Sequence, residues 1–422
     1  VEQGVAYIYK NEKGMFRQAD QVSGNNGTLS VTNAATYLPA AASADEDWNM
    51  GAAVAVSSGS AVAVAAPNHP ETQGGIGIYE PNADKTNWTL TSALGATDMG
   101  YDFGRAIAFD KAVSGTKQLF FYGGPSAGGG GGATGNCGEV RLAIGTDGAG
   151  TADNYSTAAV ELTYDPPGGG NASHVVDQFL GYSVAAHDGV VVAGAPGSRV
   201  LGTAGGATSG PSGAAFVWAN TKDAGGTTAT LQAGYYTNVA ILTGTVWDSA
   251  GGGGLHANTP GFGADVDIYG DTIVVGAPSG EGGAAGTVSK AGRVFVFTST
   301  DVRNSDKWDH AAVLTASDGS SADFFGSSVR MPNRNTIVIG APGDEVPGGA
   351  TSAGSIYVFT GNGSNWDQVQ RITYTGAATS SKYGFNRAIA ATQKEIFVGS
   401  SDEPTGPSTE TNNPEKIIRY RI

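Results

Sequence analysis

The fold is decided by the run Asp323-Phe-Phe-Gly-Ser-Ser-Val, which is followed by Thr336-Ile-Val-Ile-Gly-Ala-Pro-Gly and Gly354-Ser-Ile-Tyr-Val-Phe-Thr. A fourth run, Asn365-Trp-Asp-Gln-Val-Gln-Arg-Ile, completes the pattern. Short runs rich in β-branched and aromatic residues, separated by Gly, Pro, Asn and Asp, predict strands joined by turns. The second run is continuously apolar, which indicates a strand covered on both faces. Four such strands are the content of one antiparallel propeller blade.

The same pattern recurs along the chain, and the Gly-rich connectors between its runs differ in length. Further copies open at Asn49-Met-Gly, Tyr101-Asp-Phe-Gly, Phe179-Leu-Gly and Gly261-Phe-Gly, with a degenerate copy at Tyr383-Gly-Phe. The repeats predict an all-β fold, a β-propeller of four-stranded antiparallel blades, and they leave little room for helices. Six openings predict six blades, and a seventh blade assembled from the terminal strands is the alternative.

Both ends of the chain contain strand-like runs that are suited to closing the ring. These are Val5-Ala-Tyr-Ile-Tyr-Lys, Gly14-Met-Phe-Arg-Gln and Lys416-Ile-Ile-Arg-Tyr-Arg-Ile. An unclosed ring would leave an exposed strand edge, so we expect the N- and C-terminal strands to close it. We therefore expect a single domain over residues 1–422, with closing strands and a connector in 1–46 and the repeats in 47–422.

The Phe-Gly pair at each opening has a physical explanation that needs no ligand. An aromatic ring at the start of the innermost strand can wedge between blades, while the glycine permits close backbone approach. The Gly-Ala-Pro sequence ends a buried strand, because proline cannot donate the next ladder hydrogen bond. We therefore interpret four aromatic residues as core and not as ligand contacts: Phe103, Phe179, Phe262 and Phe325.

Together, the Phe-Gly opening, the Gly-Ala-Pro closure and the Gly-x-Val-Tyr-Val-Phe third run resemble FG-GAP repeats. That family includes the N-terminal β-propeller of integrin α subunits and many secreted or cell-surface proteins. The resemblance covers nearly the whole chain from about Asp47 onward. It implies an extracellular or cell-surface protein, but propellers carry many unrelated functions.

Composition narrows the classes of partner. The 422 residues include 67 Gly, only 14% are charged, and the formal net charge is −15, which disfavours nucleic acid or an anionic membrane surface as partner. No apolar run approaches the roughly 20 residues needed to span a bilayer. Cys137 is the only cysteine, so neither an intrachain disulfide nor a cysteine-built zinc site can form.

The resemblance also implies a possible cofactor, because integrin-type repeats often carry an Asp-x-Asp-x-Asp-Gly calcium loop between the first and second strands. The corresponding turns here are short Asp, Asn and Gly hairpin turns that lack this loop. We expect no cofactor. The one alternative is a metal site at Asp265, Asp267 and Asp271, where several carboxylates surround one turn.

No catalytic set emerges from the sequence, because the five histidines occupy unrelated contexts. In a propeller the connectors after Gly-Ala-Pro would gather on one face, which is the default binding surface. Candidate ligand-binding residues on those connectors are His69, Glu71, Arg199, Glu281, Asp344, Glu345, Asp402 and Glu403. Solvated loop residues are the ordinary interpretation of all of them.

Five Asn-x-Ser/Thr sequons mark glycosylation candidates, at Asn26, Asn87, Asn154, Asn171 and Asn362. A chain this rich in Asn, Ser and Thr would show about four by chance. The leading hypothesis is an extracellular, non-enzymatic protein used in adhesion or as a structural subunit. Its expected partners are other protein subunits, including copies of itself, or surface glycans. The alternative is a carbohydrate-active enzyme or lectin that uses the loop face.

The altered first turns generate a prediction about calcium. Because no turn carries the Asp-x-Asp-x-Asp-Gly loop, the melting temperature should change little when a chelator is added. A bound ion stabilises the folded state by mass action, so a sharp fall on adding EDTA would show that calcium ligands lie elsewhere.

Overall fold

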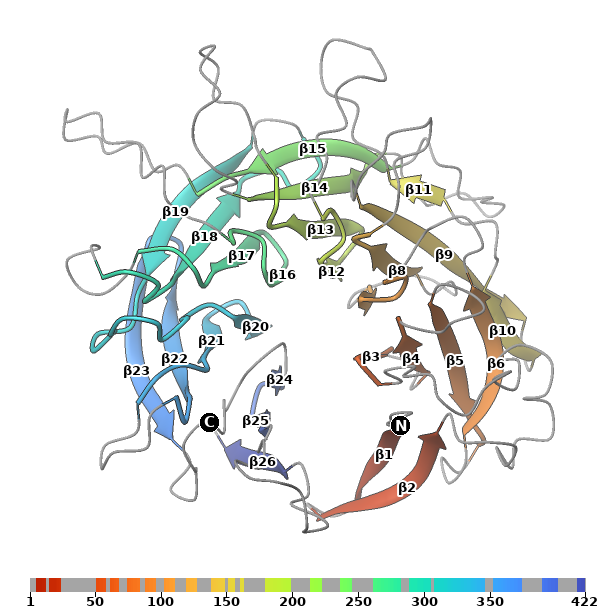
Figure 1. The fold of residues 1–422 in the computed structure, drawn as a ribbon. Helices are drawn as coiled ribbons and strands as arrows, with labels where there is room; N and C mark the ends of the chain where they lie inside the picture. Colours follow the sequence, from red (N-terminus) through yellow and green to blue (C-terminus); the bar gives the residue numbers. More distant parts are fainter. Residues whose placement is uncertain are drawn as a thin grey trace. The chain divides into compact units, whose positions relative to one another are not determined.

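The computed structural model is an all-β structure, and its described residues contain no helix. It describes residues 5–12, 15–23, 51–57, 61–67, 74–83, 88–95, 102–110, 119–126, 138–148, 151–155, 160–162, 179–198, 213–221, 236–244, 261–281, 288–304, 307–345, 352–373, 389–400 and 416–421. With no helix in these ranges, none is present that could cross a membrane. The strands form compact antiparallel sheets, drawn in Figure 1.

The chain divides into two compact units, which are described separately. Unit 1 comprises Val1–Gly189 and Asn220–Thr237, and unit 2 comprises Val190–Ala219 and Asn238–Ile422. The division passes through the third Phe-Gly repeat, whose first strand lies in unit 1 and whose second strand lies in unit 2.

Unit 1 holds the N-terminal hairpin and the first two full repeats. Its strands are β1 (Val5–Glu12), β2 (Met15–Ser23), β3 (Ala53–Val56), β4 (Val62–Ala66), β5 (Gly75–Pro81), β6 (Trp88–Gly95), β7 (Ala106–Phe109), β8 (Leu119–Gly124), β9 (Glu139–Gly148), β10 (Thr151–Tyr155), β11 (Val160–Leu162) and β12 (Ser183–His187). Strands β3 to β6 form a four-stranded sheet in chain order. In the next sheet two short strands, β10 and β11, both pair with β9, so the fourth strand is split.

Unit 2 holds the remaining repeats. Its strands are β13 (Val190–Ala195), β14 (Ala214–Asn220), β15 (Tyr236–Leu242, which straddles the division), β16 (Val266–Tyr269), β17 (Thr272–Ala277), β18 (Arg293–Ser299), β19 (Trp308–Leu314), β20 (Ser328–Asn333), β21 (Thr336–Ala341), β22 (Ser355–Asn362), β23 (Asn365–Thr373), β24 (Ile389–Ala391), β25 (Glu395–Ser400) and β26 (Lys416–Arg421). Strands β16 to β19 and β20 to β23 form two four-stranded sheets in chain order (Figure 1).

These sheets confirm the predicted fold class, a β-propeller built from four-stranded antiparallel blades. The C-terminal strand β26 pairs with β25 and completes a three-stranded last sheet, while β1 pairs with β2. Closure between the two ends stays a prediction, as does the single-domain assignment. Where the third strand meets the fourth, a β-bulge recurs in three blades, at Ile78/Tyr79, Val296/Phe297 and Val358/Phe359. Such a bulge increases the local twist of the outer strand.

The second strand of each full blade forms the centre of the core. Strands β4, β8 and β17 are buried along their whole length, as the continuous apolar runs predicted. One face of β17 contributes Val274 to a cluster that includes Phe325 and Ile337 of the next blade. The core is therefore built from the opposed faces of successive blades, as expected for strands covered on both sides.

The Phe-Gly openings join one blade to the next within each unit. Phe103 forms an isolated parallel bridge with Gly74, and Phe325 forms the same bridge with Gly292. Both rings are fully buried and pack edge-on against a tyrosine of their own blade, Phe103 on Tyr122 and Phe325 on Tyr357. The interpretation of the aromatic openings as core is confirmed here, and equally for Phe262.

The third opening differs from the prediction by one residue. Leu180, and not Phe179, forms the bridge to Gly138 and is the buried member of the pair. Phe179 is half-buried and takes a left-handed backbone with φ 56°, as does Phe324 in the fifth blade. The prediction placed the buried opening residue at Phe179 because that residue is aromatic. The opening position is instead defined by the backbone bridge to the preceding blade, and this position accepts leucine.

A prediction follows from the packing of Gly276, whose φ is not positive. A Cβ there would lie 2.0 Å from the carbonyl oxygen of Gly326 in the next blade. Gly276→Ala should therefore reduce the free energy of unfolding by about 3 kcal/mol, because backbone must move. Gly363→Ala is the control, since Gly363 has φ +54° but nothing within 4 Å, and it should cost about 1 kcal/mol. Equal losses in urea denaturation would contradict the steric explanation.

Candidate functional site

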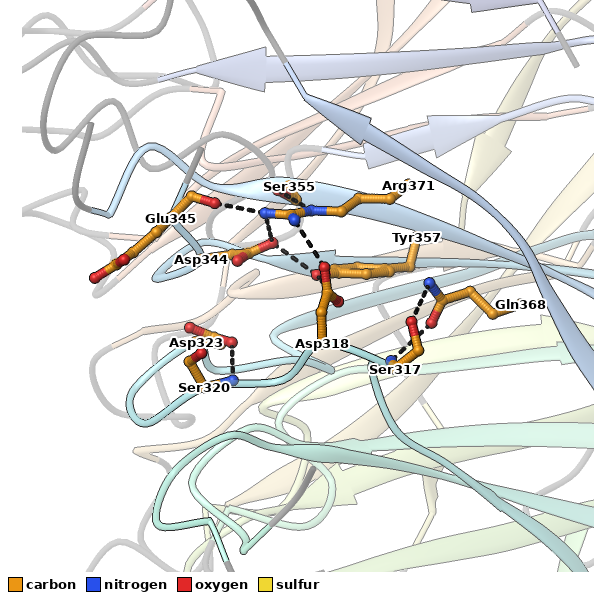
Figure 2. A network of polar contacts seen from close by, with 10 residues as sticks. All are labelled: Ser317, Asp318, Ser320, Asp323, Asp344, Glu345, Ser355, Tyr357, Gln368 and Arg371. Carbon is orange, nitrogen blue, oxygen red and sulfur yellow. Dashed lines mark hydrogen bonds and ion pairs between the residues drawn. The ribbon is translucent and has the colours of Figure 1, made fainter. Parts of the chain in front are cut away.

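An extensive polar cluster lies at the connector end of the fifth blade. Strand direction alternates within a blade, so the β19–β20 and β21–β22 connections emerge at the same end. The first connection supplies Asp318 and the second supplies Asp344, while Tyr357 comes from β22 and Arg371 from β23. Figure 2 shows these four side chains converging.

Tyr357 and Arg371 each contact both carboxylates. The Tyr357 hydroxyl lies 2.7 Å from Asp344 Oδ2 and 2.9 Å from Asp318 Oδ1. Because a phenol carries one proton, it donates to one carboxylate at a time. Arg371 Nη1 donates to Asp318 Oδ2 at 2.7 Å, and Nη2 lies 2.8 Å from Asp344 Oδ2. The guanidinium thus links the connection between the fourth and fifth blades and the β21–β22 connection to the outermost strand of the fifth blade.

Further hydrogen bonds fasten this network to the backbone. Arg371 Nη2 donates to the carbonyl oxygen of Glu345, and Nε donates to Ser355 Oγ at 3.3 Å. Gln368 on β23 accepts from the Ser317 N–H at 3.0 Å and donates to its hydroxyl at 3.0 Å. Both connections are therefore held against β23.

The electrostatics keep the network in one protonation state. Burial raises the pKa of Tyr357, and the hydrogen bond to Asp344 raises it further. Burial alone would lower the pKa of Arg371, but Tyr357, Asp344 and Asp318 outweigh that effect and raise it. Tyr357 therefore stays neutral and Arg371 stays charged, so the network acts as a fixed brace.

Asp323 lies beside this network, and its carboxyl has a strongly altered pKa. Asp323 is 1% exposed, and this burial raises the pKa of its carboxyl to about 6, with a further contribution from the charges of Asp344 and Asp318. The backbone N–H of Ser320 donates to Asp323 Oδ2, and this hydrogen bond and the charge of Arg371 both act to lower the pKa of Asp323. The raised pKa therefore reflects mainly the burial of the carboxyl, and the neighbouring carboxylates add to it.

The weak metal candidate at Asp265, Asp267 and Asp271 has a different structural role. Asp265 Oδ2 accepts from the N–H of Val329 at 2.9 Å and from Arg330 Nη1 at 2.6 Å. Asp267 Oδ2 accepts from the N–H of Met331 at 2.7 Å. Asp271 forms an ion pair with Arg334.

These acceptors bind the innermost strand of one blade to that of the next, a role that one sequence cannot reveal. In unit 1, Asp110 does the same by accepting from the N–H groups of Asp188 and Gly189, both at 2.7 Å. In the described part of the chain no three His, Cys, Asp or Glu residues form a group that could hold a metal ion.

The structure brings together two of the eight sequence-predicted ligand residues. Asp344 is buried in the network and Glu345 beside it is exposed. Glu281 lies in the fourth blade, where burial lowers the pKa of Arg293 and the Glu281 charge opposes that shift. The other five, His69, Glu71, Arg199, Asp402 and Glu403, lie outside the described residues.

Sequence reasoning missed Asp318, Asp323, Tyr357 and Arg371. The Asp318-Gly pair could have been read as a turn in the connector, and Tyr357 stands out only as the polar member of an aromatic strand. Nothing in the fourth run marks Arg371. Of the sequons, Asn362 is exposed at the β22–β23 turn and Asn154 lies in β10, while Asn26, Asn87 and Asn171 lie outside the described residues.

The raised pKa of Asp323 generates a prediction about pH. Its folded pKa lies above the unfolded value, so its stabilising contribution is complete below about pH 4 and is lost as the pH rises through about 6. Asp323→Asn should therefore gain about 2 kcal/mol relative to wild type between pH 4 and pH 7. Denaturation across this range tests it, with the exposed Asp367→Asn as charge control. A difference from wild type that is independent of pH would refute it.

Comparisons with known proteins add to this geometry. No curated protein matches the sequence. A crystal structure described as a putative 6-phosphogluconolactonase from Bacteroides fragilis NCTC 9343 is 12% identical, with a TM-score of 0.46, and the match covers 99% of this chain and 90% of that chain. The profile described as FG-GAP repeat matches residues 308–359, from β19 through most of β22. The chain is therefore a β-propeller protein that carries an FG-GAP repeat.

Proposed function

We propose that this protein is an extracellular, non-enzymatic β-propeller that works through protein–protein or glycan contacts. Its role would be adhesion, or that of a structural subunit in a cell-surface or filamentous assembly. The observation that carries the proposal is the state of the polar cluster on the fifth blade. Asp344 is engaged by both Tyr357 and Arg371 and is 4% exposed, so it serves as a brace for the connectors.

Asp323 has the kind of raised pKa that general acids require, yet its position argues against that use. A general acid must come within hydrogen-bond reach of the reacting group. Asp323 is 1% exposed and covered by the connector that includes Ser320. A substrate would need to displace that connector, so the buried acid is better explained as part of the packing.

The connector end of the blade has the properties of a docking platform. Arg371 holds the described connector residues Asp318, Asp344 and Glu345, so these positions lose little conformational entropy on binding. Glu345 is exposed there and presents its carboxylate to a partner, whereas both carboxylate oxygens of the exposed Asp318 contact Tyr357 and Arg371. A partner with basic or hydrogen-bond-donating side chains would complement this end.

Two Gly-rich connectors, Gly123 to Gly138 and Leu201 to Gly213, are further candidate assembly surfaces. Most of their residues lie outside the described part of the chain. Their ends serve the blade junctions, since Gly138 bridges to Leu180 and Gly213 bridges to Phe262. Between these anchored ends, near-absence of side chains would allow another backbone to approach closely.

Native mass spectrometry and electron microscopy of the purified protein test the proposal. We expect oligomers, filaments or ordered arrays. Glu345→Gln should weaken assembly, because it removes an exposed charge at this end and leaves the contacts of Arg371 with Asp318 and Asp344 intact. Lys394→Ser, at the exposed β24–β25 turn, is the matched surface control and should assemble normally.

Two results would contradict the proposal. One is a protein that remains monomeric at all concentrations and binds no surface protein. The other is reproducible turnover of a polysaccharide, which would favour the alternative of a carbohydrate-active enzyme. Binding to a glycan array without turnover and without assembly would favour the lectin alternative.

A further inference from the structure

One of the five sequons occupies a defined and exposed hairpin turn. Asn362 is the last residue of β22 and pairs with Asn365, so Gly363 and Ser364 form a two-residue loop. Gly363 has φ 54°, and Ser364 does not have a positive φ. This is the pattern of a type II′ turn, in which glycine takes the first loop position.

The backbone of this turn is well fastened. Trp366 Nε1 donates to the carbonyl oxygen of Gly363 at 2.9 Å. Asn335, in the neighbouring β20–β21 turn, donates through Nδ2 to the carbonyl oxygen of Gly361 at 2.9 Å and accepts from the Gly361 N–H at 3.0 Å. The turn therefore holds its shape without using the side chains of the sequon.

The side chains of the sequon residues Asn362 and Ser364 are accessible for modification. Asn362 and Ser364 are both exposed, and within the described part of the chain neither side chain makes a hydrogen bond or ion pair. A Cβ built on Gly363 would meet nothing within 4 Å, which shows that space around the turn is open. A bulky group on Asn362 could thus be accommodated without disturbing the sheet.

The turn also lies at a particular end of the blade. The ladder between β21 and β22 runs from Thr336↔Thr360 to Ala341↔Ser355, so the β22–β23 turn and the connector with Asp344 lie at opposite ends. Asn362 is therefore remote from the connector end where the polar network gathers. It also adjoins the start of β23, the outermost strand of its sheet.

We propose that Asn362 is an N-glycosylation site and that its glycan marks the end of the blade that is not used for assembly. In the transfer, Asn362 Nδ2 forms a bond to the anomeric carbon of a lipid-diphosphate-linked oligosaccharide. The bond from that carbon to the diphosphate breaks, and the amide nitrogen loses a proton. This proposal rests on the proposed function, because only a secreted or cell-surface protein would meet this glycosylation machinery.

The position of the glycan explains how one end of the blade stays free of unwanted contacts. An outermost strand presents unpaired backbone groups that invite pairing with another chain. A hydrated glycan beside the first residues of β23 would block that pairing. The connector end, with Asp318 and Glu345, would remain uncovered.

The test is secretion from a eukaryotic host that glycosylates a co-secreted reference glycoprotein. Peptide mass spectrometry before and after enzymatic deglycosylation should find a glycan on the peptide that contains Asn362. Asn362→Gln and Ser364→Ala should each abolish that glycan. Asn365→Gln, which changes an exposed asparagine of the same hairpin outside the sequon, should retain it.

An unmodified Asn362 peptide would overturn the proposal, even if other sequons carry glycans. The variants should keep the wild-type circular dichroism, because the side chains they change are exposed. The outcome is separable from that of the proposed function. A glycosylated protein that remains monomeric would refute assembly and leave the glycan site standing, whereas an assembling protein without this glycan would do the reverse.

Discussion

Contact between glycine backbones at the blade junctions is the constraint on which the rest of this structure depends. Gly326 donates its N–H to the carbonyl oxygen of Gly340 in its own blade at 3.0 Å. Its own carbonyl oxygen lies where a Cβ on Gly276 of the preceding blade would be. The same arrangement joins Gly181 to Gly123 in unit 1. Only residues without side chains let two blades approach this closely, which is why the Phe-Gly and Gly-Ala-Pro sequences recur together.

The polar residues at the junctions depend on this close approach. With the innermost strands brought together, Asp265 and Asp267 can accept hydrogen bonds from the backbone of β20. An aspartate is well suited to this task, because its two oxygens satisfy N–H groups that have no strand partner. The acidic residues that resemble a metal site in the sequence thus act as substitutes for a missing strand pairing. Carboxylates that would suggest a metal or catalytic site in another fold here help to hold successive blades together.

Much of the fold could be predicted from the sequence, because each repeat carries its own local signal. The apolar second run of every blade and the turn residues around it predicted β13, β17 and β21 directly. Two features could not be predicted. The bridge at Leu180 depends on backbone position and not on an aromatic ring, and the division of the fourth strand into β10 and β11 depends on pairing with β9.

The candidate site was far less predictable than the fold. Asp344 could be named because it follows Gly-Ala-Pro, but its partners Tyr357 and Arg371 come from two other strands. Their convergence depends on the order of the strands in the sheet and on the face of the sheet from which each side chain projects. Neither can be predicted for a single residue from one sequence. The two ends of the fifth blade therefore differ. The connector end is acidic and held by Arg371, whereas the opposite end consists of short turns.

Amide hydrogen exchange tests the central claim most directly, since it reports the local stability of each junction. The N–H of Phe325 donates to Ala291 at 2.9 Å across the junction, and the N–H of Gly326 is bonded within the blade. If the glycine contacts hold successive blades together, both amides should exchange as slowly as that of Val338 in the buried strand β21. Exchange of Phe325 and Gly326 as rapid as that of Ser364 in the exposed turn would contradict the account.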